Sequence, residues 1–244
     1  MKAMILAAGL GTRLQPITNK KPKALVEVGG IPLLEIMIKK LISFGFNEII
    51  INIHHFADQI IEFLERKNNF YINIAISDER NELLNTGGGI KKAGWFFNDD
   101  KDFLVINVDV LTDLDLRILM DHHIATGALV TIAVRNRPTS RYFLFDDNMK
   151  LYGWKNIKSG ERRVVRDEEE NLTSFAFSGI HIINPKIYEM INYKGSFSVV
   201  DLYLDLARNH KIFGYRHDDG FWMDVGKREN LEKGAGFIER TRGK

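Results

Sequence analysis

The sequence predicts an α/β protein with a mainly parallel sheet flanked by helices, followed by a part rich in antiparallel strands. Two observations predict the sheet. Short apolar runs rich in β-branched residues alternate with segments whose apolar residues recur at helical spacing. Strands separated by helices imply right-handed crossovers and parallel pairing. Because such sheets bind ligands beyond the carboxyl ends of their strands, we expect functional residues in the loops that follow strands.

Four strands and three helices are expected in the first half. Pro32 opens the first helix, whose apolar residues recur on one face, and Gly45 ends it. The second helix repeats this spacing over residues 57–64, and Gly87–Gly89 open a short third helix. The expected strands are Met4–Leu6, Glu48–Ile53, Ile72–Ser77 and Phe103–Val108.

The second half is predicted to be richer in hairpins. Two apolar strands flank the turn at residues 146–148, and the charged segment Glu161–Glu170 is expected to be a solvated hairpin or loop. A helix begins near Ser198. The chain shows no repeat and no linker, so we expect a single domain over residues 1–244, with parts at 1–135 and 136–226 and a C-terminal helix at 227–244. The strands are Tyr142–Phe145, Met149–Trp154 and Phe175–Ile183.

The segment from Met4 to Lys23 has the features of a polyphosphate site. Its apolar strand runs into Gly9 and Gly11, which let the backbone turn tightly and bring N–H groups close to an anion. Arg13 and Lys23 add two cations that can reach the same place. These features indicate a phosphate-binding loop, and the alternative is an ordinary loop with glycines for turning.

Three other interpretations of this segment fit less well. A dinucleotide fingerprint would need glycine where Leu14 stands, and an acidic residue where the second strand is followed by His54. The Walker pattern does not occur, and Pro16 and Pro22 prevent a helix from following directly. The apolar run from Ala3 is short for a signal peptide and lacks a convincing cleavage site.

Two aspartates are candidate magnesium ligands. Asp109 ends the apolar run FLVINVD, and Asp224 ends another apolar run in FWMDVG. Magnesium prefers oxygen ligands and is typically held by one or two carboxylates together with substrate phosphates. Each aspartate alone could equally be a turn residue, but their occurrence with the Gly9–Lys23 segment favours a metal site. The seven histidines are expected to be surface or core residues.

Composition excludes several other classes of protein. The 34 basic and 32 acidic residues give a formal charge of +2, which predicts no nucleic-acid partner and no membrane partner. The absence of cysteine excludes disulfides, thiolate nucleophiles and cysteine-ligated zinc. No apolar run approaches the roughly 20 residues needed to span a bilayer, so a cytoplasmic protein is expected. Nothing in the sequence predicts an oligomeric state.

The N-terminal signature LAAGLGTRLQPITNKKPKAL resembles that of the sugar-1-phosphate nucleotidyltransferases, which join a nucleoside triphosphate to a sugar 1-phosphate and release pyrophosphate. The resemblance continues through TGGGI at Thr86–Ile90, the strand ending in Asp109, FSGIHI at Phe177–Ile182 and WMDVG at Trp222–Gly226. It implies the nucleotide-diphospho-sugar transferase fold, a Rossmann-like sheet with an antiparallel-rich sugar-binding lobe.

The resemblance also implies roles for individual residues. Lys23 would be catalytic and would bridge the attacking and leaving phosphates, Arg13 would assist it, and Asn107 and Gly179 would lie against the sugar phosphate. Asp109 and Asp224 would bind Mg²⁺. Lys155 and Lys158 are alternatives for a lysine of the family that this chain lacks. The nucleoside triphosphate would contact Leu6, Ala8, Gly9, Gly11, Thr12, Arg13, Asn85, Gly87 and Gly88.

Within the family, the NTGGG and FSGI pieces and the length most resemble N-acetylmuramate-1-phosphate uridylyltransferases, and almost as much short mannose-1-phosphate guanylyltransferases. We therefore expect UTP and N-acetylmuramate 1-phosphate as substrates and a product used as a cell-wall or polysaccharide precursor. Glucose-1-phosphate uridylyltransferases and thymidylyltransferases are further alternatives. A different class of protein, a catalytically silent nucleotide-sugar sensor, would have no need to retain Lys23, Asp109 and Asp224 together.

Overall fold

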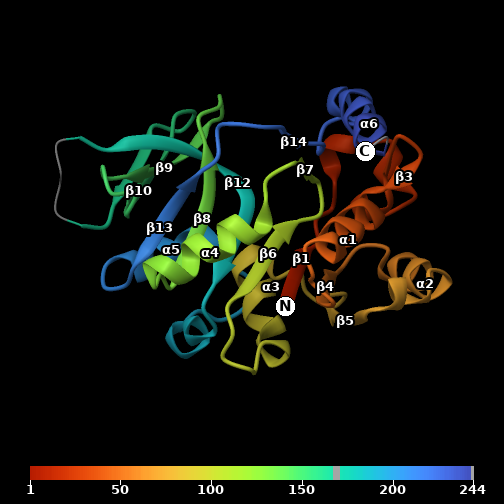
Figure 1. The fold of residues 1–244 in the computed structure, drawn as a ribbon, viewed down its shortest axis with the longest axis horizontal. Coiled ribbons are helices and arrows are strands. Elements are labelled where there is room, and N and C mark those ends of the chain that lie inside the picture. Colours follow the sequence, from red (N-terminus) through yellow and green to blue (C-terminus); the bar gives the residue numbers. More distant parts are fainter. Residues whose placement is uncertain (167–170, 243–244) are drawn as a thin grey trace. The chain divides into compact units, whose positions relative to one another are not determined.

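The computed structural model describes residues 1–166 and 171–242, which form two compact units. The first consists of Met1–Leu84, Ile106–Asp113 and Phe221–Lys244, and the second of Asn85–Val105 and Leu114–Gly220. The two units are therefore interleaved along the chain, whereas the expected subdivision runs at residues 135 and 226. Both combine helices and strands, and Figure 1 shows their elements in sequence colours.

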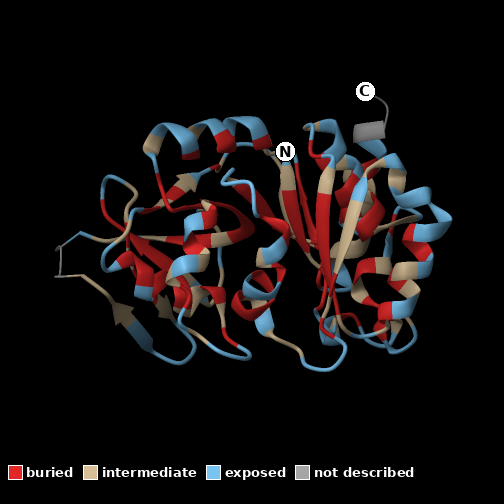
Figure 2. Ribbon diagram, turned by 90° about the horizontal axis from the view of Figure 1, so that it is seen from below, coloured by how far each residue is buried: buried red, intermediate tan, exposed pale blue. Residues whose placement is uncertain are grey.

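A parallel sheet forms the centre of the first unit. Strand β1 (Lys2–Leu6) pairs in parallel with β4 (Glu48–Ile53), and β4 pairs in parallel with β5 (Asn73–Asp78). The crossovers carry helices α1 (Leu33–Ser43) and α2 (Ala57–Arg66). Strands β1 and β4 are largely buried and β5 is mostly half-buried, whereas the helices in Figure 2 carry both buried and exposed residues. The expected parallel sheet covered by helices is therefore confirmed.

Helix α1 illustrates how the sequence specifies these elements. Its apolar residues lie on one face, and Leu34, Ile38 and Leu41 are fully buried. Phe44 and Gly45 follow the helix, and Gly45 has a φ of +84°, in the region that favours glycine. The helix therefore begins after Pro32 and ends before Gly45, as its apolar pattern predicts.

An antiparallel strand pair and a C-terminal helix complete the first unit. Strand β7 (Val110–Thr112) pairs with β14 (Trp222–Asp224) and follows shortly after β6 (Phe103–Asn107). Helix α6 (Glu229–Arg242) comes next in the chain. The short strands β2 (Glu27–Val28) and β3 (Ile31–Pro32) pair with each other. The pairing of β7 with β14 matters for function because it joins two segments that are far apart in sequence.

Antiparallel strands dominate the second unit, as expected. Strand β12 (Thr173–Ile183) pairs antiparallel with both β8 (Val130–Arg135) and β9 (Arg141–Phe145), and β13 (Ile212–Arg216) pairs in parallel with β8. The remaining elements are β10 (Leu151–Asn156), β11 (Glu161–Val164), α3 (Asn85–Lys92), α4 (Leu116–Thr126) and α5 (Val199–Ala207). Short 3₁₀ turns of the second unit lie at Ala93–Phe96 and Pro185–Met190. Those of the first unit include Ile17–Asn19 and Asn68–Tyr71.

Some helices and strands begin at other residues than predicted. The first hairpin strand ends at Phe145 as predicted, but the second begins at Leu151, because the amides of Met149 and Lys150 bond back to Asp146. The segment Glu161–Glu170 begins with β11, and its residues 167–170 lie outside the described residues, as do residues 243–244 of the C-terminal segment. Helix α3 begins at Asn85, before the glycines that were expected to open it.

Candidate functional site

The loop after β1 presents exposed residues next to a buried strand end. Ala7 and Ala8 are buried, whereas Gly9, Thr12 and Arg13 are exposed. Gly11 has a φ of +66°, and a Cβ there would lie 2.9 Å from Thr18 Cγ2. Only glycine fits this backbone without strain, so Gly11 shapes the turn into the 3₁₀ segment Thr12–Leu14. Leu6 is the last residue of β1 and is half-buried.

Lys23 differs from the other lysines of the segment in its surroundings. It opens a 3₁₀ turn, Lys23–Leu25, and its side chain is only 14% exposed. Its ammonium group donates to Asp109 Oδ2. Lys20 is exposed, and Lys21 lies 3.9 Å from Glu27 in an ion pair. The fold therefore brings one lysine of the three against the carboxylate that follows β6.

The two predicted magnesium ligands converge. The pairing of β7 with β14 sets Asp224 opposite Val110, and the amide of Val225 donates to the carbonyl of Asp109 over 3.0 Å. Asp109 is 6% exposed and follows β6 closely, while Val108 donates to the carbonyl of Leu6 over 3.1 Å. The carboxylates therefore lie beside the end of β1 and its loop, where their positions at the ends of apolar runs led us to expect them.

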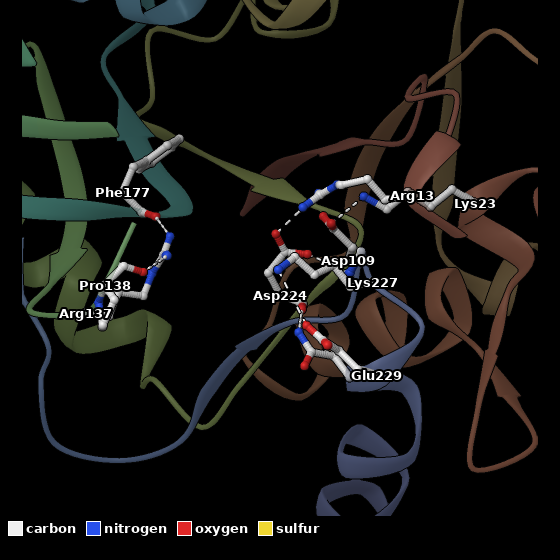
Figure 3. Close-up of polar contacts among 11 residues, drawn as sticks. Arg13, Lys23, Asp109, Arg137, Pro138, Phe177, Asp224, Lys227 and Glu229 are labelled. Carbon is white, nitrogen blue, oxygen red and sulfur yellow. Dashed lines mark hydrogen bonds and ion pairs between the residues drawn. The ribbon is translucent and has the colours of Figure 1, made fainter. Parts of the chain in front are cut away.

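Arg13, Lys23, Asp109 and Asp224 form a cluster that we call the charged cluster, and their side chains point toward one another in Figure 3. Arg13 Nη2 lies 3.6 Å from Asp224 Oδ2. The amide of Gly226 donates to Asp224 Oδ1 over 2.6 Å. A Cβ on Gly226 would lie within 3.0 Å of oxygens of both aspartates and 2.7 Å from Arg13 Nη2. Gly226 is thus required for the close approach of these groups.

Burial and the neighbouring groups shift the pKa values of the two aspartates in opposite directions. Burial raises the pKa of Asp109, the neighbouring Asp224 raises it further, and Lys23 opposes the rise. Burial opposes ionisation of Asp224 too, but hydrogen bonding with Asp109 and Gly226 and the charges of Lys23 and Arg13 hold its pKa below the usual value. Two close carboxylates of this kind suit a divalent cation, whose charge would relieve their repulsion.

The two carboxylates of the charged cluster fit a magnesium ion whose remaining ligands come from water and substrate. Among the described residues, no group of three or more histidine, cysteine, aspartate or glutamate side chains is placed to hold a metal ion. Asp109 and Asp224 supply two carboxylates, and magnesium usually completes its coordination with water and substrate phosphates. The residues present therefore fit a cation that enters together with a polyphosphate, and they do not fit an all-protein metal cage.

The remaining predicted residues fall in two places. Asn107, the half-buried last residue of β6, belongs to the first unit with the charged cluster. Asn85, Gly87, Gly88 and Gly179 belong to the second unit.

In the second unit, the amides of Gly87 and Gly88 donate to the carbonyl of Phe197 over 2.9 and 3.3 Å. A Cβ on Gly87 would lie 2.5 Å from the Phe197 ring, so close packing also requires this glycine. Asn85 is exposed and its side chain accepts from the amide of Thr86. Gly179 has a φ of +75° where the register of β12 against β8 shifts.

Sequence reasoning did not find three residues near the site. Gly226 lies in the WMDVG piece, but its role depends on the approach of Arg13 and Asp109 from other segments. Asn52 and Glu79 are buried polar residues beside the loop after β1. An asparagine in an apolar strand and a glutamate in a charged loop have no local pattern that marks them, and strand register alone brings them together.

Comparisons with known proteins identify the family of this chain. Residues 2–241 match the nucleotidyl transferase family. The chain is 33% identical to UTP–glucose-1-phosphate uridylyltransferase of Synechocystis sp. over 93% of its own length, and it spans only 60% of that relative. It is 32% identical to N-acetylmuramate alpha-1-phosphate uridylyltransferase of Caulobacter vibrioides, covering 92% of this chain and 91% of the relative.

The fold has close structural counterparts. The crystal structure of HddC from Yersinia pseudotuberculosis complexed with GMP-PN superposes with a TM-score of 0.77 at 24% identity, covering 97% of this chain and 99% of that one. No helix in the described part of the chain is long and apolar enough to cross a membrane. The expected fold is confirmed, and the chain belongs to the nucleotidyl transferase family, with sugar-1-phosphate nucleotidyltransferases among its relatives.

Proposed function

We propose that this protein is a magnesium-dependent sugar-1-phosphate nucleotidyltransferase that uses UTP and N-acetylmuramate 1-phosphate. The observation that carries the reaction class is the convergence of two cations and two carboxylates at the end of β1 and β6. The substrate pair is supported by the uridylyltransferase relative that this chain spans over 91% of its length. Mannose 1-phosphate with GTP, and glucose 1-phosphate with UTP or dTTP, are the competing pairs.

The reaction needs little covalent help from the protein. A sugar phosphate is largely a dianion near neutrality, because its second pKa is about 6. One of its oxygens forms a bond to the α-phosphorus of the nucleotide, the bond from that phosphorus to the bridging oxygen breaks, and pyrophosphate leaves. The protein has to align these atoms and neutralise the charge that develops on them.

The residues of the charged cluster would divide this task. The exposed loop Gly9–Arg13 would hold the triphosphate through backbone amides and the Arg13 guanidinium. Lys23 would leave Asp109 to contact the α-phosphate and the leaving oxygens. Asp109 and Asp224 would hold Mg²⁺, which when bound neutralises phosphate charge. Asn85 and the Gly87–Gly88 segment would recognise the base, and Asn107 and Gly179 would contact the sugar phosphate.

A substrate grid tests this proposal. The purified protein is supplied with each of UTP, dTTP, GTP, ATP and CTP against N-acetylmuramate, mannose and glucose 1-phosphates, and pyrophosphate release is measured with and without magnesium. We expect UTP with N-acetylmuramate 1-phosphate to give the highest kcat/KM. Dominance of GTP with mannose 1-phosphate would overturn the substrate assignment. Failure of every pair, with a nucleotide sugar still bound, would favour the silent sensor.

A further inference from the structure

A buried relay of hydrogen bonds ties the loop after β1 to the segment that leads to Asn85. The amide of Ala7 donates to Asn52 Oδ1 over 2.7 Å. Asn52 Nδ2 donates to Glu79 Oε1 over 2.8 Å, and the amide of Leu84 donates to Glu79 Oε2 over 3.1 Å. Asn52 is 3% and Glu79 is 1% exposed. Each of these side-chain atoms therefore has a partner in a place where water is excluded.

Strand register explains why these residues meet. Asn52 lies opposite Leu6 in the pairing of β1 with β4, so its side chain is next to the first residue of the loop. Glu79 directly follows β5, and its amide donates to the carbonyl of Ile53 over 2.7 Å. His54 Nδ1 donates to the Glu79 carbonyl over 2.7 Å. The backbone around Glu79 is thus held independently of its carboxyl group, which is left to bridge two other segments.

We propose that Asn52 and Glu79 are positioning residues for nucleotide binding. This inference rests on the proposed function, because both ends of the relay lead to residues that the proposed function assigns to the nucleotide. Ala7 immediately precedes Ala8 and Gly9, and Leu84 immediately precedes Asn85. By fixing both amides, the relay holds the phosphate loop and the backbone at Leu84 ready before the nucleotide arrives, which lowers the ordering cost of binding.

The polarity of the relay gives it a specific test. Both partners of Glu79 are N–H donors, so the single amide oxygen of a glutamine can satisfy only one of them. In Glu79→Gln, the new amide group therefore faces either Asn52 Nδ2 or the amide of Leu84, and that buried donor loses its acceptor. Adding Asn52→Asp reverses the polarity of the middle bond. One carboxylate oxygen still accepts from Ala7, the other accepts from the new amide, and Leu84 keeps an acceptor.

The experiment compares the wild-type protein, Glu79→Gln, the double variant Asn52→Asp with Glu79→Gln, and the control Glu82→Gln. Glu82 is an exposed glutamate on the same loop. We expect Glu79→Gln to raise the nucleotide KM roughly five- to fiftyfold, from the cost of an unpaired buried donor, with the sugar-phosphate KM nearly unchanged. The double variant recovers the nucleotide KM to within about threefold, the tolerance for a restored but imperfect network. The control behaves as wild type.

Amide hydrogen exchange without ligand provides a readout that does not depend on turnover. Glu79→Gln should speed exchange at Ala7 and Leu84, and the double variant should slow it again, while exchange in α6 stays constant. If wild-type protein releases no pyrophosphate, the proposed function fails, but the exchange data still test the relay. A nucleotide KM unchanged in Glu79→Gln, or a loss that the double variant does not recover, would overturn the positioning role.

Discussion

Lys23 illustrates how much of the site is determined by single residues. Lys20, Lys21 and Lys23 lie close together in the sequence. Among these three, only Lys23 forms an ion pair with Asp109 in the described structure. A lysine ammonium on a flexible stem can follow charge from an attacking phosphate to a leaving one. Its contribution is therefore expected in the transition state more than in nucleotide binding.

Replacing Lys23 should separate turnover from binding. We expect Lys23→Ala to lower kcat about 100- to 1,000-fold, the usual cost of removing one positioned electrostatic donor, with a much smaller loss of triphosphate affinity. Pyrophosphate release and calorimetric titration with the nucleotide measure the two effects. Lys20→Ala and Lys21→Ala are the matched controls. Equal, small effects for all three variants would mean that the segment is merely a solvated basic turn.

The carboxylate pair should determine the magnesium requirement. Asp109→Asn and Asp224→Asn each remove one anionic ligand while keeping the size of the side chain, so we expect most turnover to be lost with the fold retained. Turnover is measured as a function of magnesium concentration, and circular dichroism monitors folding. A variant with a near-native rate at limiting magnesium would show that its aspartate is not a ligand.

At the residue scale, sequence reasoning was most effective where chemistry is local. Asp109 and Asp224 each end an apolar run, and Arg13 and Lys23 belong to one signature, so their convergence could be predicted. The relay through Asn52 could not. An asparagine within a strand acquires its meaning from the register of β4 against β1, and this register is a long-range property.

Helices and strands also divide into those that a local pattern predicts and those that depend on long-range pairing. Helix α1 and strand β4 were predicted because their periodicity is complete within the element. Helix α4 and strands β8 and β13 were not among the expected elements, because the residues that mark the start and end of an element are less distinct there. Strand β7 is only three residues long and becomes a strand through its pairing with β14. Such pairs have no local signature, although this one brings the two aspartates together.

Helix α6 offers a test at the scale of an element. Gly236 has open space where a Cβ would be, so Gly236→Ala should raise the free energy of unfolding by about 0.5–1 kcal/mol through helix propensity. Gly234 is buried, and its Cβ would lie 3.0–3.1 Å from side-chain carbons of Leu111, Val28 and Val225. Gly234→Ala should therefore destabilise by roughly 1–3 kcal/mol. Urea unfolding measures both, and equal effects would contradict the packing of α6.

For the molecule as a whole, a buried histidine makes stability depend on pH. His181 is fully buried in β12, contacts the Tyr203 hydroxyl through Nδ1, and has its pKa lowered by burial from 6.5 to about 3. The unfolded chain binds a proton at this residue below pH 6.5, whereas the folded chain does not. Its neutral form therefore supports the fold above pH 6.5, and this contribution is lost as the pH falls toward 3.

Unfolding free energies measured across this range test the assignment. We expect His181→Asn, which cannot titrate but keeps a polar atom near Tyr203, to be less stable than wild type at pH 8. Between pH 6 and pH 4, its stability should fall less steeply, by up to about 1.4 kcal/mol per pH unit. Identical slopes for the two proteins would mean that His181 is protonated in the folded state or accessible to water.

The pairing of β7 with β14 also has a consequence for biosynthesis. Asp109 is translated long before Asp224, and the first unit includes segments from both ends of the chain. A nascent chain on the ribosome can form the β1–β4–β5 sheet early, but it cannot assemble the carboxylate pair until residues 222–224 have emerged. The carboxylate pair proposed to hold magnesium is therefore completed only after the β14 segment has been translated, long after Asp109.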